Sequence, residues 1–238
     1  MTTAVLPSPA PVAPPKPRPS LVAAVEWMRA MGPGEKVLFD EVSWDEYDWF
    51  DRQRKELGSG VRLTYADGRM ELMTTSFFHD RSSERLNDIV KSLGVELDVP
   101  FEPAGRTTFR REDLDRGLEP DQCFYIQNVA AVQGLREIDL TIHPPPDLAV
   151  EIDHTRSSLP KQPIYAALGV PEVWRFDGTA VTFLVLQPGG VYQPQPTSRA
   201  FPAVGSADVT RVLLAEATSH NAFLRAVRAW AAALASQS

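Results

Sequence analysis

Three carboxylates in two short segments of this sequence have the spacing of a site for metal or acid–base chemistry. Asp121 lies in EPDQCFYI, and Glu151 and Asp153 stand at the end of the apolar run PPPDLAVEID. Because side chains alternate between the two faces of a strand, Glu151 and Asp153 point the same way. If the two segments form neighbouring strands, Asp121 joins them at one edge of the sheet. Three carboxylates so close together repel one another unless one is protonated or a cation is bound, and their hard oxygens suit Mg²⁺ or Mn²⁺.

Lys161 follows Glu151 by ten residues, at the start of the next predicted helix. From there it could turn back over the end of the strand. An ammonium group in that place could orient a water nucleophile or stabilise the charge that develops on a phosphoryl group. Acidic residues at strand ends are also commonly solvated, and a lysine beside them can simply face water. Spacing alone therefore leaves the metal site and the solvated strand end both open.

The elements that must position these residues form a mixed pattern of helices and strands. Helices are expected at 20–31, 44–57, 77–97, 159–168 and 219–235, and the second of them begins with a capping box at Ser43-x-x-Glu46. Asp67-Gly68 and Asp177-Gly178 each predict a hairpin turn. Further strands are expected at 100–112, 118–127 and 145–153, and the last of these is apolar enough to be buried on both faces. This order predicts one α/β core domain with a mixed sheet flanked by helices.

Composition sets limits on the class of protein. The chain has 238 residues and a net charge of −7, which counts against constitutive, high-affinity binding of nucleic acid but leaves an acidic, metal-binding enzyme site open. The single cysteine, Cys123, excludes an internal disulfide framework, and no Cys/His pair has the spacing of a structural zinc site.

The N-terminal segment differs from the rest of the chain. Residues 1–19 contain seven prolines and are expected to form an extended or disordered tail, while residues 20–238 are expected to form a single domain. Because the N-terminus lacks the form of a signal peptide and no apolar run reaches the length of a membrane span, a cytoplasmic protein without contact to a membrane is expected.

Several other side chains have two interpretations. His79, near the positive end of the helix at 77–97, could contact phosphate or carry a proton, or serve as a capping or packing residue; His154 has the same ambiguity. The arginines before Asp121 could line a phosphate cleft, although the mixed charges of RREDLDRG favour a solvated loop. These arginines are Arg106, Arg110, Arg111 and Arg116.

An ordered set of motifs resembles the Uma2 family. The motifs are YADGRMELM, the downstream His79, EPDQCFYI, PPPDLAVEID, a lysine-containing helix and YAALGVPEVWRFDG, and together they extend over about residues 40–205. Uma2 proteins are bacterial proteins related to restriction endonucleases, with the PD-(D/E)xK nuclease fold. The resemblance implies a restriction-endonuclease-like mixed β-sheet core, over about residues 60–205, flanked by helices.

The resemblance also implies a Mg²⁺-dependent site that cleaves phosphodiester bonds. The aspartate of the motif falls on Asp121 and the glutamate of its (D/E)xK element on Glu151, whereas Asp153 occupies the position of the usual lysine. In this family a lysine from the following helix, here Lys161, is thought to substitute. An acidic residue often completes the metal shell in this fold, and the candidates are Glu84 on the helix and Glu71 on the preceding strand, although a solvent-facing role suits either better.

The leading hypothesis is therefore an endonuclease that hydrolyses DNA with Mg²⁺ or Mn²⁺. Asp121 and Glu151 hold the metal, Asp153 assists or binds a second ion, Lys161 positions the attacking water, and His79 is a further catalytic candidate. The resemblance also allows a homodimer, because many nucleases of this fold cut duplex DNA as dimers. Two alternatives stay open: a catalytically degenerate nuclease-fold protein that acts in binding or assembly, and a metal-dependent hydrolase of a small phosphorylated substrate.

Overall fold

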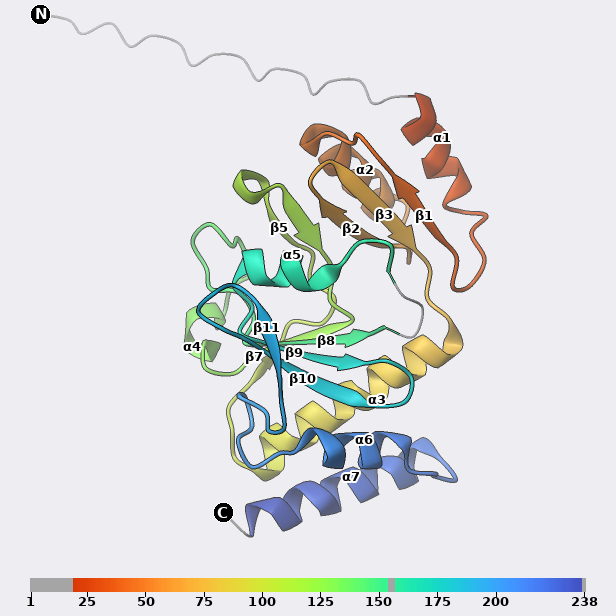
Figure 1. The fold of residues 1–238 in the computed structure, drawn as a ribbon. Helices are drawn as coiled ribbons and strands as arrows, with labels where there is room; N and C mark the ends of the chain where they lie inside the picture. The colour runs from red at the N-terminus through yellow and green to blue at the C-terminus, as the bar shows by residue number, and fades with distance from the viewer. Residues whose placement is uncertain (1–18, 154–156, 237–238) are drawn as a thin grey trace, which may run out of the picture.

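The computed structural model of the chain describes residues 19–153 and 157–236 and places their strands in two β-sheets (Figure 1). The first sheet has five strands in the order β1-β3-β2-β6-β5, each pair antiparallel. Its strands are β1 (Lys36–Phe39), β2 (Arg62–Ala66), β3 (Arg69–Met73), β5 (Phe109–Arg111) and β6 (Arg116–Leu118). The second sheet has six strands in the order β11-β10-β9-β8-β7-β4. Its strands are β4 (Glu102–Pro103), β7 (Gln122–Tyr125), β8 (Leu148–Ile152), β9 (Glu172–Phe176), β10 (Val181–Leu186) and β11 (Tyr192–Gln195).

Helices precede, connect and cover these sheets. In the described residues they are α1 (Pro19–Trp27), α2 (Trp44–Glu56), α3 (Phe77–Glu96), α4 (Val129–Val132), α5 (Lys161–Leu168), α6 (Ser206–Leu214) and α7 (His220–Ala235), with a short 3₁₀ helix at Glu112–Leu114. None of the helices in this part of the chain combines the length and the apolar character that crossing a lipid bilayer requires. The tail predicted over residues 1–19 lies, up to residue 18, outside the described residues.

Local sequence signals explain several of these elements. The side chain of Ser43 accepts a hydrogen bond from the backbone of Glu46, and the side chain of Glu46 accepts one from the backbone of Ser43, so the predicted capping box begins α2. Asp67 and Gly68 both have positive φ, 49° and 73°, as the tight turn between β2 and β3 requires. Gly169 ends α5 in the left-handed conformation with φ 78°. The capped helix, the hairpin and the end of α5 are therefore confirmed as predicted.

The second sheet is mixed because α5 carries the chain from the end of β8 back to the side of the sheet on which β8 begins. β8 pairs in parallel with β9, and the crossover between them runs through α5. β7 pairs with the other side of β8 in the antiparallel sense, so β8 lies between neighbours on both sides. All five residues of β8 are buried, as expected for a central strand covered on both faces.

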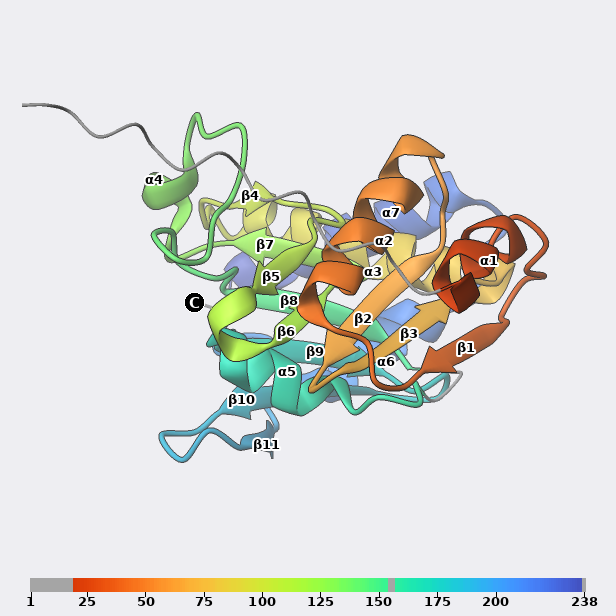
Figure 2. The ribbon, with the colours of Figure 1, turned by 90° about the horizontal axis from the view of Figure 1, so that it is seen from above.

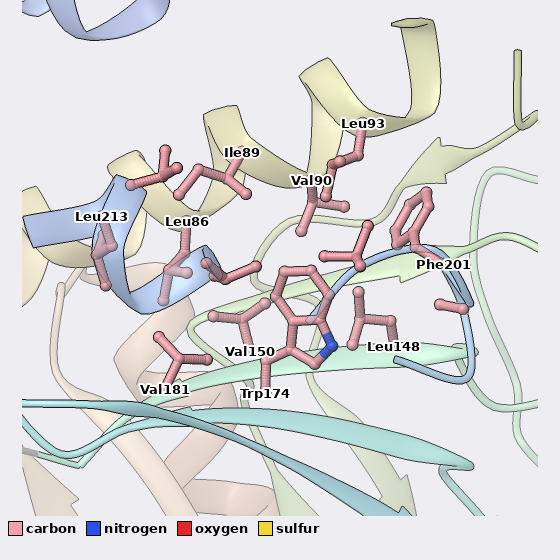
Figure 3. Packing of buried hydrophobic residues seen from close by; sticks show 14 of the residues in the cluster. Leu86, Ile89, Val90, Leu93, Leu148, Val150, Trp174, Val181, Phe201 and Leu213 are labelled. Carbon is pink, nitrogen blue, oxygen red and sulfur yellow. The ribbon is translucent and has the colours of Figure 1, made fainter. Parts of the chain in front are cut away.

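One face of the second sheet carries a large apolar core. The residues on the buried stripe of α3 are Leu86, Ile89, Val90 and Leu93, and they pack in one cluster with Val150 of β8 and Trp174 of β9. Figure 3 shows these side chains meeting between α3 and the sheet, with Leu213 of α6 beside them. The helices α6 and α7 complete the cover, and α7 packs along α3. The apolar packing on this face of the second sheet therefore stabilises the fold.

The opposite face of the second sheet is covered by α5, which also reaches the first sheet. Tyr165 of α5 lies in one buried cluster with Ala149 of β8 and Val173 of β9, and with Phe109 and Leu118 of the first sheet. Figure 1 shows α5 between the two sheets, and Figure 2 shows it beside β6. The two sheets therefore meet through α5 on the face that carries Glu151.

The hairpin of the first sheet buries both of its faces. Leu63 and Leu72 pack with α1 and α2 in a third apolar cluster. The other face carries Arg62, Thr64 and Glu71, which are also buried. A buried polar face needs partners for its charged groups, and these partners lie near the start of α5 and the start of β7.

The chain changes sheets at Pro120, which sequence reasoning did not anticipate. A single strand was expected over 118–127, but β6 ends at Leu118 in the first sheet and β7 begins at Gln122 in the second. Pro120 has no backbone N–H and so cannot continue the ladder of the first sheet. The segment at 100–112 likewise divides into β4 and β5, one in each sheet, whereas β1 and α6 were not predicted. The expected single sheet is therefore two sheets.

A buried ion-pair network fixes the segment between β6 and β7. Arg54 of α2 donates to both carboxylate oxygens of Glu119, one of them at 3.0 Å, and pairs with Asp51 at 2.6 Å. The carboxylate of Glu119 also accepts a hydrogen bond from Thr108, and Lys55 is a second partner of Asp51. Because Glu119 and Arg54 are both less than a tenth exposed, the pair ties α2 to the residues just before Asp121.

Replacing Gly117 by alanine is expected to destabilise the fold. A Cβ atom at Gly117 would lie 2.7 Å from Cζ of Tyr47, a buried ring stacked on Tyr65. Forcing that ring to shift should lower the free energy of unfolding by about 1–3 kcal/mol, measured by urea denaturation. Gly60→Ala is the matched control, because a Cβ there meets nothing within 4 Å. Equal stability of the two variants would contradict this packing.

Replacing Arg54 by methionine should cost about 3–5 kcal/mol of unfolding free energy, because it leaves Glu119 and Asp51 buried without their cation. The pKa of Asp51 is lowered in the folded chain: burial opposes this, but hydrogen bonds and charge from Lys55 and Arg54 outweigh it. The contribution of Asp51 is therefore present above its unfolded pKa of about 4 and is lost as the pH falls through the lower folded value. The difference in unfolding free energy between the wild type and Arg54→Met should accordingly become smaller as the pH falls.

Arg228→Met is the control for this measurement, because Arg228 pairs with Glu96 at 2.8 Å but its side chain is 65% exposed. Little change in stability is expected from it. If Arg54→Met were as stable as Arg228→Met at neutral pH, the network would not hold this segment.

Candidate active site

The antiparallel pairing of β7 and β8 brings Asp121 and Glu151 together. Gln122 pairs with Val150, so the residue before the first and the residue after the second lie beside each other. The backbone N–H of Asp121 donates to Val150 at 3.1 Å, and Oδ2 of Asp121 accepts a hydrogen bond from the N–H of Ile152 at 2.8 Å. Both carboxylates are buried, with 1% and 4% of each residue exposed. The structure thus places two of the predicted site residues next to each other.

The carboxylate of Glu151 is held by two residues of α5. Nζ of Lys161 lies 2.6 Å from Oε2, and the hydroxyl of Tyr165 donates a hydrogen bond to Oε1. Lys161 and Tyr165 are four residues apart, so both project from the same side of the helix. The lysine predicted to reach back to Glu151 does so in this structure.

The carboxylate of Asp121 is surrounded by positive and polar groups from other elements. Nη2 of Arg62, on β2, lies 3.2 Å from Oδ1, and Nε2 of His79, on α3, lies 3.1 Å from Oδ2. Arg62 also donates to the carbonyl oxygen of Pro120 at 3.1 Å. Arg62 and His79 are themselves buried, which makes their contacts with Asp121 hard for water to replace.

These contacts separate the pKa values of the two carboxyl groups. Burial pushes the pKa of Asp121 upward, but the hydrogen bond from His79 and the charges of Lys161, His79 and Arg62 outweigh it and hold the pKa at about 2. Burial raises the pKa of Glu151; Lys161 opposes this and the negative charge of Asp121 reinforces it. Burial lowers the pKa of Lys161, but Glu151 and Asp121 raise it above its usual value. The carboxyl group of Asp121 is therefore ionised at neutral pH, and both carboxylates attract the positive ammonium group of Lys161.

The donor chemistry of this pair fits a hard divalent cation. Among the described residues no group of three or more His, Cys, Asp or Glu side chains is arranged to hold a metal ion. Mg²⁺, however, is usually bound through one or two carboxylates and keeps several waters. Asp121 and Glu151 repel each other, and a cation between them would relieve that repulsion. These two side chains are accordingly the ones that could hold the ion.

Asp153 is engaged elsewhere. Its carboxylate pairs with Arg175 of β9, at 2.8 Å from Nε and 2.6 Å from Nη2, and its backbone N–H donates to Phe176. The alternation of β8 does place Asp153 on the same side as Glu151, and both line one pocket of about 470 Å³. The other residues that line this pocket are Met73, Ile152, Ser157, Leu159, Pro160, Lys161, Gln162, Pro163, Tyr165, Val173, Arg175 and Leu184.

The remaining candidates lie in different surroundings. The solvent-facing role expected for Glu71 is wrong: Glu71 is buried and accepts hydrogen bonds from the side chain of Ser157 and the backbone of Ser158, so it anchors the segment that leads into α5. Glu84 is exposed on α3 and accepts a hydrogen bond from Asn87. His154 lies outside the described residues.

The arginine cluster is paired with acidic side chains at the surface. Each of the four arginines has its own carboxylate partner; the pairs are Arg106 with Asp80, Arg110 with Asp48, Arg111 with Asp113 and Arg116 with Asp67. This agrees with the mixed-sign, solvated loop that the sequence favoured over a phosphate cleft.

Sequence reasoning missed two residues that touch the carboxylates, Arg62 and Tyr165. Tyr165 follows Lys161 by four residues, a spacing that could have placed it on the same side of the helix. Arg62 and Thr64 share the polar side of β2, and no pattern in the sequence indicated that this side is buried.

Comparison with known proteins identifies the family. The model of the Uma2 family, described as "Putative restriction endonuclease", matches residues 44–215. No curated protein matches the chain. A solved structure of a putative nuclease belonging to DUF820, from Anabaena variabilis ATCC 29413, is similar at 16% identity, with 64% of this chain and 91% of that chain covered and a TM-score of 0.45.

The family match spans most of the chain, and it includes Asp121, Glu151 and the helix that carries the lysine. The family predicted from the sequence motifs is therefore confirmed, and the structure has the mixed α/β character that the sequence predicted. This chain belongs to the Uma2 family.

Proposed function

We propose that this protein is a metal-dependent endonuclease that hydrolyses phosphodiester bonds in DNA. The observation that carries the proposal is the juxtaposition of two buried carboxylates, Asp121 and Glu151, with the ammonium group of Lys161 at 2.6 Å from Glu151. Asp153 occupies the motif position where a lysine is usual, and Lys161 supplies an equivalent charge from α5. Membership of a family described as putative restriction endonucleases supports the same reaction.

Each side chain has a role in this proposal. Asp121 and Glu151 would hold Mg²⁺ or Mn²⁺; when bound, the ion polarises a phosphoryl oxygen and makes a water molecule a stronger nucleophile at neutral pH. Lys161 orients the attacking water and stabilises the negative charge that develops on the phosphoryl group. His79 keeps Asp121 in place through its contact with Oδ2. It acts on the site through Asp121 rather than by contact with the substrate.

Asp153 has a smaller part than the sequence alone suggested. Arg175 neutralises it, and a second ion could bind there only if Arg175 moved away. We therefore propose a site built on one ion and two carboxylates. The proposed setting is the cytoplasm, and cleavage of both strands of a duplex would call for a homodimer.

Cleavage of supercoiled plasmid DNA with Mn²⁺ tests the proposal. Asp121→Asn, Glu151→Gln and Lys161→Met should each slow cleavage by about 10²-fold or more, because each removes a charge that acts on the reacting groups. Asp208→Asn removes a half-buried carboxylate on α6 and serves as the control. EDTA should abolish cleavage by the wild type. Cleavage that continued unchanged in all three site variants would place the activity elsewhere.

Asp153→Asn distinguishes the one-ion site from a two-ion site in the same assay. We expect a loss of less than about tenfold, since Asp153 is already paired with Arg175. A loss as large as that of Glu151→Gln would mean that Asp153 is a ligand or catalytic group.

A second candidate function rests on the pocket beside Glu151. Its volume of about 470 Å³ falls within the range of about 300–1,000 Å³ typical of small-molecule sites, and the net charge of −7 suits a compact substrate better than a long polyanion. A metal-dependent hydrolase of a small phosphorylated substrate would cleave bis(p-nitrophenyl) phosphate with Mn²⁺ while leaving plasmid DNA intact.

The ion pairs of Lys161 and Arg175 would also suit a degenerate site that acts only in binding or assembly, in which case neither substrate would be cleaved.

A further inference from the structure

The two oxygens of the Glu151 carboxylate are held by groups of different kinds. Oε1 accepts a hydrogen bond from the neutral hydroxyl of Tyr165, whereas Oε2 pairs with the ammonium group of Lys161 at 2.6 Å. Both groups come from α5, one helical turn apart. A single short helix therefore fixes which oxygen faces a neutral donor and which faces a cation.

Tyr165 is built into the core and has little freedom to move. The residue is 1% exposed, and its ring lies in the buried cluster formed by α5 and both sheets. The residues of this cluster that come from the two sheets include Phe109, Leu118, Ala149, Val173 and Leu184. Because a close-packed interior resists displacement of a large ring, the hydroxyl of Tyr165 is a fixed donor to Oε1.

The side chain of Lys161, in contrast, has room to change its conformation. It is the first residue of α5, its side chain is 16% exposed, and it lines the pocket beside Glu151. Its flexible four-carbon stem lets the ammonium group swing without any change in the helix. The same ammonium is attracted by Asp121 as well as by Glu151, so it offsets the repulsion between the two carboxylates.

We propose that Tyr165 is a positioning residue that turns Oε2 of Glu151 toward the metal position, and that Lys161 holds that position until a divalent cation binds. This inference rests on the proposed function and adds an order of events to it. Lys161 leaves Oε2 when the cation binds, while Tyr165 keeps Oε1. The released ammonium group stays within the pocket, next to the place of the substrate phosphate.

The inference predicts effects of opposite sign on metal affinity. Loss of the Tyr165 hydroxyl leaves Oε1 buried without its donor and frees the carboxylate to rotate, which weakens metal binding. Loss of the Lys161 charge removes a competitor for Oε2, which strengthens metal binding although it slows cleavage. A lysine that only supported the structure of the site would give no such gain.

Binding of Mn²⁺ alone, without nucleic acid, measures both effects. In titrations followed by electron paramagnetic resonance of free Mn²⁺, Tyr165→Phe should weaken binding by about tenfold, the usual size for a residue that orients a metal ligand. Lys161→Met should tighten binding by at least about threefold, because a like charge no longer opposes the ion. Tyr192→Phe is the matched control: Tyr192 is a buried tyrosine whose hydroxyl donates to the backbone of Val170, away from Glu151. It should bind as the wild type does.

The double variant Tyr165→Phe with Lys161→Met tests whether the two residues act on the same carboxylate. The gain from Lys161→Met should shrink when Tyr165 no longer fixes Oε2, so the two changes should not be additive. Circular dichroism checks that each variant is folded, and Lys161→Met alone carries the test if Tyr165→Phe is not. Weaker or unchanged Mn²⁺ binding by Lys161→Met, or wild-type binding by Tyr165→Phe, would overturn the inference.

The outcomes also separate this inference from the proposed function. If the wild type binds no Mn²⁺ at millimolar concentration, the proposed function and this inference fail together. Suppose instead that the wild type binds Mn²⁺ and cleaves DNA but both variants bind Mn²⁺ as Tyr192→Phe does. Then only the inference fails that Tyr165 orients Glu151 and that Lys161 gives way to the cation.

Discussion

Two negative charges buried side by side impose the strongest constraint on this structure. Asp121 directly precedes β7, Glu151 lies on the adjacent β8, and both are almost inaccessible to water. A buried charge costs several kcal/mol unless it is paired and hydrogen-bonded. The fold meets this demand by directing groups from several elements to one point. They are Arg62 from β2, His79 from α3, Lys161 and Tyr165 from α5, and the backbone of Ile152. Each of these elements therefore supplies a partner to the pair.

The division of the chain into two sheets follows from the same demand. The first sheet supplies Arg62 from its polar face, and the second supplies the carboxylates themselves. The segment that passes from one sheet to the other is fixed at each step: Glu119 by Arg54, the carbonyl oxygen of Pro120 by Arg62, and then Asp121 by its own partners. The Arg54 pair therefore stabilises a connection whose displacement would carry Asp121 away from Glu151.

Structural features that depend only on residues close together in the sequence were predictable from it. The capping box at Ser43, the turn at Asp67 and Gly68 and the end of α5 at Gly169 are all local signals, and all appear in the structure. The alternation along β8 correctly gave Glu151 and Asp153 a common side. It could not give the register with β9, which places Arg175 opposite Glu151 and within reach of Asp153. That register depends on packing between segments far apart in the sequence.

The polar side of β2 shows the same limit. Alternation predicts that Arg62 and Thr64 share a face, but whether that face meets water or another layer depends on the arrangement of the second sheet and α5. The motif resemblance supplied what periodicity could not, namely that Asp121 lies beside Glu151 and that Lys161 of the next helix reaches back to Glu151.

A crystal structure of the protein soaked with Mn²⁺, with the ion located by its anomalous scattering, tests the central claim most directly. The site described above predicts one strong peak between Asp121 and Glu151, at about 2.1 Å from their carboxylate oxygens. It also predicts that Lys161 has withdrawn from Oε2 of Glu151 while Tyr165 still donates to Oε1. A peak bound by other residues, or an unchanged pair of Lys161 and Glu151 in a crystal saturated with Mn²⁺, would contradict it.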